Sequence, residues 1–302
     1  MRGTGLDEVD RIIIDIASDN KSGSTDILKR CVNAVQTFTE GYHGKPDEFL
    51  RELLAVCRKL LEAQPAMAPV FNCVNDVLCT VEGMAKNLMR EFTLQWCEAY
   101  MRELEKAREW VVEEGVGLIE DAGAVATISY SSTVLDILTQ GGREYQVMIS
   151  EGRPMNEGSR AAELLADHGI STTLVVDAAL PYLVENADLV LVGADTVNQS
   201  HVYNKTGTFA LLMASLHYDV PFYVVAERNK FAPKEHFTPR IVEHPGYEVA
   251  YVKHEHLHIK NIYFDRIPVD QVTGVVTDLG IMKPHDVRKI VQDRKISSML
   301  VR

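Results

Sequence analysis

One stretch of the sequence gathers side chains that suit a small polar ligand. Asp195 follows the apolar run Leu189–Val192 and a Gly-Ala pair, so its carboxylate lies just past the end of a predicted strand. Asn204 and Lys205 come shortly before a predicted helix that begins at Thr208. Lysine and helix N–H groups bind phosphate, whereas aspartate and asparagine bind hydroxyl groups. The pattern favours a phosphorylated or polyhydroxylated ligand, the alternative being that Asp195 is a turn residue and Asn204 a helix cap.

Two arginines follow another predicted strand, Tyr145–Ile149. Arg153 stands in a Gly-Arg-Pro turn at the carboxyl end of that strand, and Arg160 lies one turn into the next helix. A guanidinium group matches phosphate with two parallel hydrogen bonds, so both arginines are candidates for anion binding. For each of them, a surface salt bridge is the alternative interpretation.

A run of hydroxyl groups, Ser129-Tyr130-Ser131-Ser132, ends a third predicted strand. Ser129 and Ser131 precede a helix, and the N–H groups that open a helix attract phosphate. We therefore expect both serines to contact the ligand. A serine hydroxyl is a poor acid or base near neutral pH, and no histidine lies near it in the sequence to activate it.

The elements that carry these residues alternate between strand and helix, which predicts an α/β fold with a Rossmann-like, doubly wound parallel sheet. Ligands of such sheets bind at the carboxyl ends of the strands. The sequence has no G-x-G-x-x-G motif, so it predicts neither a dinucleotide nor another cofactor. The expected strands are Ala124–Ser129, Tyr145–Ile149, Thr172–Val176, Leu189–Val192, Phe222–Val225 and Gly274–Thr277.

The first third of the chain has a different pattern. Apolar residues recur there at three- and four-residue spacing, which predicts helices throughout. The composition changes at Gly115-Val116-Gly117, after a long charged helix. We therefore predict an all-helical N-terminal domain over residues 1–116 and a Rossmann-like α/β domain over residues 117–302, each able to fold separately.

Composition excludes several classes of function. The formal net charge of −12 disfavours direct binding of nucleic acid. The five cysteines form no CxxC pair and have no histidine at metal-ligand spacing, so we expect no metal site. Their odd number suggests reduced thiols. The sequence shows neither a membrane span nor a secretion signal, and a cytoplasmic protein is expected.

Three motifs carry a specific resemblance to a known family. They are Gly193-Ala194-Asp195, then Asn204-Lys205-Thr206-Gly207-Thr208, then the segment from Val220 to Phe231 that contains Ala226-Glu227. In this combination the chain resembles the alpha, beta and delta subunits of translation initiation factor 2B. That superfamily also contains methylthioribose-1-phosphate and ribose-1,5-bisphosphate isomerases. Near the C-terminus, Asn261–Pro268 is similar to a further family motif, in which Asp265 is either a ligand residue or part of a structural turn.

The sequence departs from the isomerase branches of this superfamily at three places. Ser129 stands where the isomerases have a cysteine that takes part in proton transfer beside the residue matching Asp195. Ser22-Gly23-Ser24 stands where they have an R-G-A loop, and Gln64-Pro65 where a more basic pair is common. These losses favour a binding or regulatory protein over a working isomerase.

The resemblance implies an initiation factor 2B-related protein with a pocket for a phosphorylated sugar or nucleoside monophosphate. It also implies a homodimer built through the α/β domains, and initiation factor 2 as a candidate partner. The first alternative is an aldose-1-phosphate isomerase, for example one acting on ribose 1,5-bisphosphate, in which Asp195 would be catalytic. The second is a purely structural subunit of a larger assembly.

Overall fold

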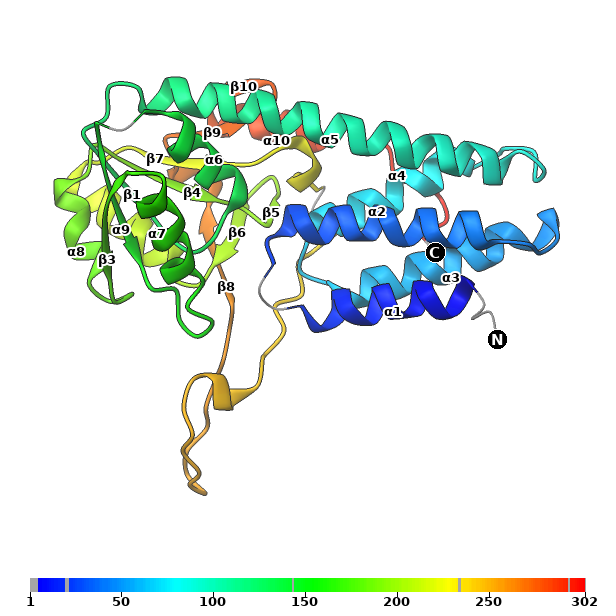
Figure 1. Ribbon diagram of the computed structural model, residues 1–302, viewed down its shortest axis with the longest axis horizontal. Helices are drawn as coiled ribbons and strands as arrows, with labels where there is room; N and C mark the ends of the chain where they lie inside the picture. The colour runs from blue at the N-terminus through cyan, green and yellow to red at the C-terminus, as the bar shows by residue number, and fades with distance from the viewer. Residues whose placement is uncertain (1–4, 20–21, 143, 233–234, 293, 302) are drawn as a thin grey trace.

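The computed structural model describes residues 5–19, 22–142, 144–232, 235–292 and 294–301. Its N-terminal part is a bundle of long helices, and its C-terminal part is an α/β domain beside one end of that bundle (Figure 1). The bundle helices are α1 (Gly5–Ser18), α2 (Ser24–Gly41), α3 (Pro46–Ala63), α4 (Ala68–Val81) and α5 (Met89–Ile119). None of the helices in the described ranges has the length and apolarity needed to span a bilayer.

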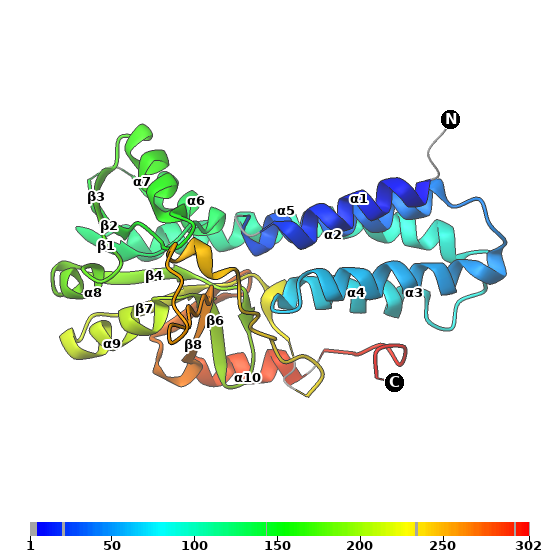
Figure 2. The same ribbon diagram turned by 90° about the horizontal axis from the view of Figure 1, so that it is seen from below.

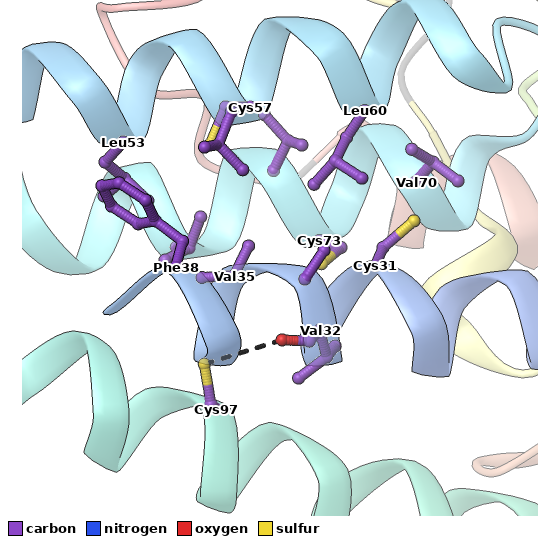
Figure 3. Close-up of a cluster of buried hydrophobic side chains, with 14 of the residues drawn as sticks. Cys31, Val32, Val35, Phe38, Leu53, Cys57, Leu60, Val70, Cys73 and Cys97 are labelled. Carbon is purple, nitrogen blue, oxygen red and sulfur yellow. Dashed lines mark hydrogen bonds between the residues drawn. The ribbon is translucent and has the colours of Figure 1, made fainter. Parts of the chain in front are cut away.

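The bundle packs around a core of buried aliphatic, aromatic and cysteine side chains (Figure 3). Apolar residues at helical spacing on α2, α3 and α4 place their side chains on one face of each helix, so the three helices bury them together. Cys31, Cys57, Cys73 and Cys97 lie in this core as free thiols. Cys79 is free as well and only partly buried.

The main sheet has the strand order β10-β9-β7-β4-β1-β2-β3, parallel except for β10. This order confirms the predicted doubly wound α/β fold, and four of the six expected strand starts lie at the positions predicted. Parallel pairing buries both faces of the central strands, which explains their continuous apolar runs. The strands are β1 (Ala124–Thr127), β2 (Gln146–Ser150), β3 (Ser171–Val175), β4 (Leu189–Gly193), β7 (Phe222–Val225), β9 (Gly274–Thr277) and β10 (Gly280–Met282).

Helices cover both faces of this sheet. One face packs against the C-terminal part of α5, α6 (Ser132–Gln140) and α7 (Glu157–Asp167). The other packs against α8 (Leu180–Leu183), α9 (Thr208–Tyr218) and α10 (Pro284–Gln292). Helix α8 is only four residues long, and a 3-10 turn, Val184–Asn186, follows it.

A second, antiparallel sheet was not predicted. It has the order β5-β6-β8, with strands β5 (Thr196–Val197), β6 (His201–Lys205) and β8 (Phe264–Pro268). Strands β5 and β6 form a β-hairpin between the end of β4 and the start of α9. Asn204 and Lys205 therefore lie on a paired strand, and both are buried.

Helix α5 crosses the predicted domain boundary. The helix continues through Gly115, Val116 and Gly117, where the boundary was expected, to Ile119. Its first half belongs to the bundle core, and Val111, Val112 and Ile119 belong to the core beside the sheet. The glycine at 115 allows close packing rather than a break, because a Cβ there would lie 2.3 Å from Cδ1 of Ile137 in α6.

Candidate functional site

A hollow with a volume of about 80 Å³ lies where the sheet reverses its winding direction. Strands β1 and β4 are neighbours there, but the chain leaves them toward opposite faces of the sheet. This leaves a crevice at their carboxyl ends, as is typical of doubly wound sheets. Residues Ile128–Ser132 after β1 and Gly193–Asp195 after β4 line it.

The helical bundle closes one side of this cavity. Its lining includes four residues at the start of α2, which are Ser22, Gly23, Ser24 and Thr25. The Ser24 hydroxyl donates to the Ala194 carbonyl at 3.5 Å and lies close enough to the Asp195 carboxyl to favour its ionised form. A Cβ placed on Gly23 would lie 3.8 Å from the carbonyl oxygen of Tyr130, so the α2 start lies against the segment before α6.

Two helix N-termini therefore open on the same cavity. The first-turn N–H groups of a helix have no carbonyl partner within that helix, and they carry partial positive charge. Helix α6 begins behind Ser131, whose hydroxyl accepts from the Val134 N–H at 3.5 Å. Helix α2 begins with Gly23 at its N-cap position and has no side-chain cap. This pair of N-termini suits an anionic group.

Another part of the lining is built around Glu157, the first residue of α7. Its Oε1 atom lies 2.5 Å from the Lys205 ammonium and accepts a hydrogen bond from the Ser129 hydroxyl at 3.2 Å. The Lys205 ammonium also lies over the Tyr263 ring, 5.1 Å from its centroid. The side chains of Lys205 and Glu157 are only 8% and 14% exposed, so little solvent screens this ion pair.

Asp195 and Lys230 add further charges to the lining. Burial raises the pKa of the Asp195 carboxyl above its ordinary value, although Lys230 and the Ser24 hydroxyl oppose that shift. Lys230 forms a buried ion pair of 3.1 Å with Glu227. Burial would raise the pKa of Glu227 as well, but the Lys230 ammonium and the Thr133 hydroxyl outweigh it and keep that pKa below its ordinary value.

The structure brings five of the predicted site residues to this one cavity: Asp195, Ser129, Ser131, Asn204 and Lys205. Asn204 also has the contact expected of a structural residue, because its amide donates to the Thr208 hydroxyl at the start of α9. Ser129 has a left-handed backbone with φ of 67°, which turns the chain sharply after β1.

The structure places three other candidates away from the lining. Arg153 donates to the carbonyls of Glu248 and Val249, at 3.2 and 3.0 Å, and so holds the segment of residues 241–262 that projects from the domain in Figure 1. Arg160 stacks on the Tyr130 ring at 4.5 Å. Asp265 accepts from the N–H groups of Gly207 and Phe209 at the start of α9, as the structural interpretation expects.

Sequence reasoning missed Glu157, Lys230 and Tyr263. Glu157 had a usable signal, because it opens the helix after β2 and the carboxyl end of β2 faces the same crevice. Lys230 lies in the motif at the end of β7. Tyr263 had no comparable signal, since β8 reaches the cavity only by pairing with β6. No group of three or more histidine, cysteine, aspartate or glutamate side chains within the described ranges is placed to hold a metal ion.

Comparisons with known proteins find relatives of this chain and a similar fold. A family model described as the initiation factor 2 subunit family matches residues 20–284. An eIF-2B subunit 2-like protein of Pyrococcus furiosus is 30% identical over 92% of this chain and 97% of its own length. A ribose 1,5-bisphosphate isomerase of Archaeoglobus fulgidus is 28% identical over 96% and 94%. The crystal structure of eIF-2B from Pyrococcus horikoshii superposes with a TM-score of 0.78 at 26% identity, covering 93% and 98% of the two chains.

Proposed function

The chain belongs to the initiation factor 2 subunit family, and from that premise we propose that its cavity binds a phosphorylated sugar or a nucleoside monophosphate without converting it. The observation that carries this proposal is the convergence of two helix N-termini, from α2 and α6, on a crevice that also holds Asp195 and Asn204. The helix ends supply N–H donors for a phosphate, and the two side chains supply partners for sugar hydroxyls.

Binding without turnover is supported by the groups that surround Ser129. Its hydroxyl has one carboxylate neighbour, Glu157, but the same oxygen atom of Glu157 already contacts the Lys205 ammonium. A serine in this setting lacks a free base that could accept a carbon-bound proton. The start of α2 contributes serine hydroxyls at positions 22 and 24 and no arginine, so the phosphate is held less firmly for reaction.

The second candidate function is isomerisation of an aldose 1-phosphate. The raised pKa of Asp195 favours it, because a carboxyl that holds its proton more tightly than usual is better suited to protonate the ring oxygen of a sugar. Relatives named as ribose 1,5-bisphosphate isomerases match most of this chain. If the chain is an isomerase, a base other than Ser129 must remove the carbon-bound proton of the sugar.

One experiment separates these functions. We would measure melting temperature and proton NMR spectra of the full chain with ribose 1,5-bisphosphate, methylthioribose 1-phosphate and AMP. The proposal expects binding, with a stabilisation of about 2.7 kcal/mol at 100 times the dissociation constant, and unchanged spectra. Turnover that Asp195→Asn abolishes would establish the isomerase instead. No melting shift at millimolar ligand would contradict both.

We further propose a homodimer formed through the α/β domains, and initiation factor 2 as its protein partner. The dimer is supported by an apolar face on α9, where Phe209, Met213 and Leu216 are exposed at helical spacing. The partner is supported by the family and by relatives named eIF-2B subunit 2-like. Co-sedimentation of the chain with purified initiation factor 2 tests the second point, and no complex at micromolar concentration would contradict it.

A further inference from the structure

One buried oxygen atom in the wall of the cavity has no hydrogen-bond donor among the described residues. Glu157 Oε2 is buried and accepts no hydrogen bond from any described residue, whereas Oε1 of the same carboxylate contacts both Ser129 and Lys205. Buried carboxylate oxygens are hydrogen-bonded in almost all proteins, because leaving one without a donor costs its full desolvation. A donor that enters from the cavity would satisfy Glu157 Oε2.

The identity of that donor follows from its chemistry. A ligand hydroxyl or N–H group can donate to a carboxylate oxygen. A fully ionised phosphate has only acceptor oxygens, and its negative charge repels the carboxylate. The wall around Glu157 therefore accepts the hydroxyl-bearing part of a ligand and excludes a phosphate.

The other charged side chains of the cavity also provide no binding site for a phosphate. Each lysine in the lining already has a carboxylate partner, Lys205 with Glu157 and Lys230 with Glu227. Asp195 adds a third carboxylate, and there is no arginine among the described residues that line the cavity. These side chains alone leave no uncompensated positive charge for an anion. The helix N-termini of α2 and α6 are the remaining place for a phosphate.

We propose that Glu157 is a specificity-determining residue, which restricts the cavity to ligands that carry one phosphate and that present a hydroxyl or N–H group to its Oε2 atom. This inference rests on the proposed function, since it concerns the same cavity. It deepens that function by separating monophosphates, such as ribose 5-phosphate or AMP, from sugar bisphosphates. The position of Glu157 is fixed by Gly158, where a Cβ would lie 1.8 Å from the Ser150 carbonyl oxygen.

Isothermal titration calorimetry of the full chain with ribose, ribose 5-phosphate and ribose 1,5-bisphosphate tests the inference. We expect ribose 5-phosphate to bind most tightly. Ribose should bind at least about ten-fold more weakly, because it lacks the group that the helix N-termini hold. Ribose 1,5-bisphosphate should also bind at least about ten-fold more weakly, because its second phosphate meets the carboxylate wall.

The variant Glu157→Gln removes the negative charge and keeps the size of the side chain. It frees the Lys205 ammonium, so we expect the affinity for ribose 1,5-bisphosphate to rise by about ten-fold or more relative to ribose 5-phosphate. The matched control is Glu163→Gln, which removes an exposed carboxylate from the same helix, outside the cavity lining. It should leave the preference unchanged.

The outcomes distinguish this inference from the function on which it rests. Equal or tighter binding of the bisphosphate by the native chain overturns the role of Glu157 but leaves a phosphate-binding cavity. A folded Glu157→Gln variant that keeps the native preference for ribose 5-phosphate over ribose 1,5-bisphosphate also overturns the role of Glu157. No binding of any of the three sugars, nor of AMP, contradicts the proposed function itself. If the variant does not fold, the preference of the native chain alone decides.

Discussion

At the scale of single residues, burial of Asp195 has opposite effects on stability and on binding. A carboxyl whose pKa is raised in the folded state holds its proton more tightly there than in the unfolded chain. Its contribution to stability therefore falls as pH rises from the ordinary range of aspartate through the raised pKa. Above the raised pKa, the ionised group is a cost to folding that a ligand hydroxyl would offset.

We predict that Asp195→Asn raises the melting temperature at pH 7.5, by roughly 2 °C for each kcal/mol of cost removed. The gain should shrink as pH is lowered toward the ordinary pKa of aspartate, because the native carboxyl then becomes neutral as well. Scanning calorimetry over a pH series measures both effects. As a control, Asp188→Asn should lower the melting temperature, since Asp188 accepts hydrogen bonds from the N–H groups of Gly123 and Ala124. A loss of stability in Asp195→Asn at pH 7.5 would contradict the prediction.

The cysteines give a second prediction at this scale. Burial raises the pKa of Cys31 to about 12 and that of Cys57 to about 12. The pKa of the buried Cys97 thiol rises to about 12 as well. Because the thiolate is the reactive form, we expect only the half-buried Cys79 to react rapidly with a disulfide reagent such as DTNB at pH 8. In guanidinium all five cysteines should react. Rapid reaction of two or more thiols in the native chain would show that the bundle core opens.

Ser129 supports a third prediction. Because a serine there cannot readily move a carbon-bound proton, the native chain should show turnover of ribose 1,5-bisphosphate near background in an NMR assay. Ser129→Cys alone should restore little, since the start of α2 still lacks an arginine. The double variant with Ser22→Arg should give the larger rate. Robust turnover by the native chain would reverse this expectation.

Much of the site could be predicted from residue type and position alone. Asp195, Ser129 and Ser131 follow parallel strands, and the carboxyl ends of such strands meet at one edge. Arg153 also follows a strand, but its side chain turns toward the carbonyls of Glu248 and Val249. Nothing in the local sequence indicates that choice, because its partners lie about a hundred residues further along the chain.

At the scale of secondary structure elements, α5 joins the two parts of the molecule, and its glycines differ in their surroundings. A Cβ on Gly115 would lie 2.3 Å from Ile137 Cδ1, and Ile137 is fully buried. A Cβ on Gly117 would meet nothing within 4 Å. The same substitution should therefore have opposite effects at the two positions.

We predict that Gly117→Ala stabilises the chain by about 0.5–1 kcal/mol, because alanine loses less conformational entropy in a helix. Gly115→Ala should destabilise it by about 1–3 kcal/mol, because Ile137 must leave its packed rotamer. Guanidinium unfolding of the two variants beside the native chain measures both changes. Similar effects of the two substitutions would mean that α5 does not pack closely on α6.

Elements formed by local pattern were predicted better than elements formed by distant pairing. The continuous apolar run of β4 identifies a strand buried on both faces. Strand β6 was missed because its sequence, His-Val-Tyr-Asn-Lys, is short and mostly polar. It is held by β8, whose partner residues lie about sixty positions further along, in the register Asn204 opposite Asp265. A strand of this kind is defined by its partner rather than by its own propensity.

At the scale of the whole molecule, the apolar face of α9 leads to a prediction about assembly. Phe209 is 48% and Leu216 is 51% exposed, although α9 otherwise packs on the sheet. If this face is the dimer contact, Phe209→Asp should convert a dimer to a monomer in sedimentation or light scattering. Phe92→Asp, at an exposed phenylalanine of the bundle, is the control and should leave the mass unchanged. A native chain that is monomeric at micromolar concentration would contradict the proposed dimer.

The two parts of the chain are joined by more than one segment. The C-terminal residues 294–301 return from the α/β domain to lie along the bundle near α4 (Figure 2). There, the Ser297 N–H donates to Asn75 Oδ1 at 2.9 Å, and the Asn75 amide donates to the Lys295 carbonyl at 2.9 Å. Asn72, also on α4, donates to the carbonyl of Phe231 at 2.8 Å. These contacts bear directly on the expectation that residues 117–302 fold separately.

We predict three levels of stability in guanidinium unfolding: the full chain, then a fragment of residues 105–302, then a fragment of residues 117–302. Both fragments lose the α4 contacts, so both should be less stable than the full chain. The shorter one also loses Val111 and Val112, which are 0% and 5% exposed beside the sheet, and the Arg108–Asp136 ion pair of 2.6 Å. Burial of each valine contributes about 2 kcal/mol, so the two fragments should differ by several kcal/mol. If the two fragments have equal unfolding midpoints, α5 is not part of the α/β domain, which then begins after that helix. If the full chain and both fragments have equal midpoints, the helical bundle does not stabilise the α/β domain.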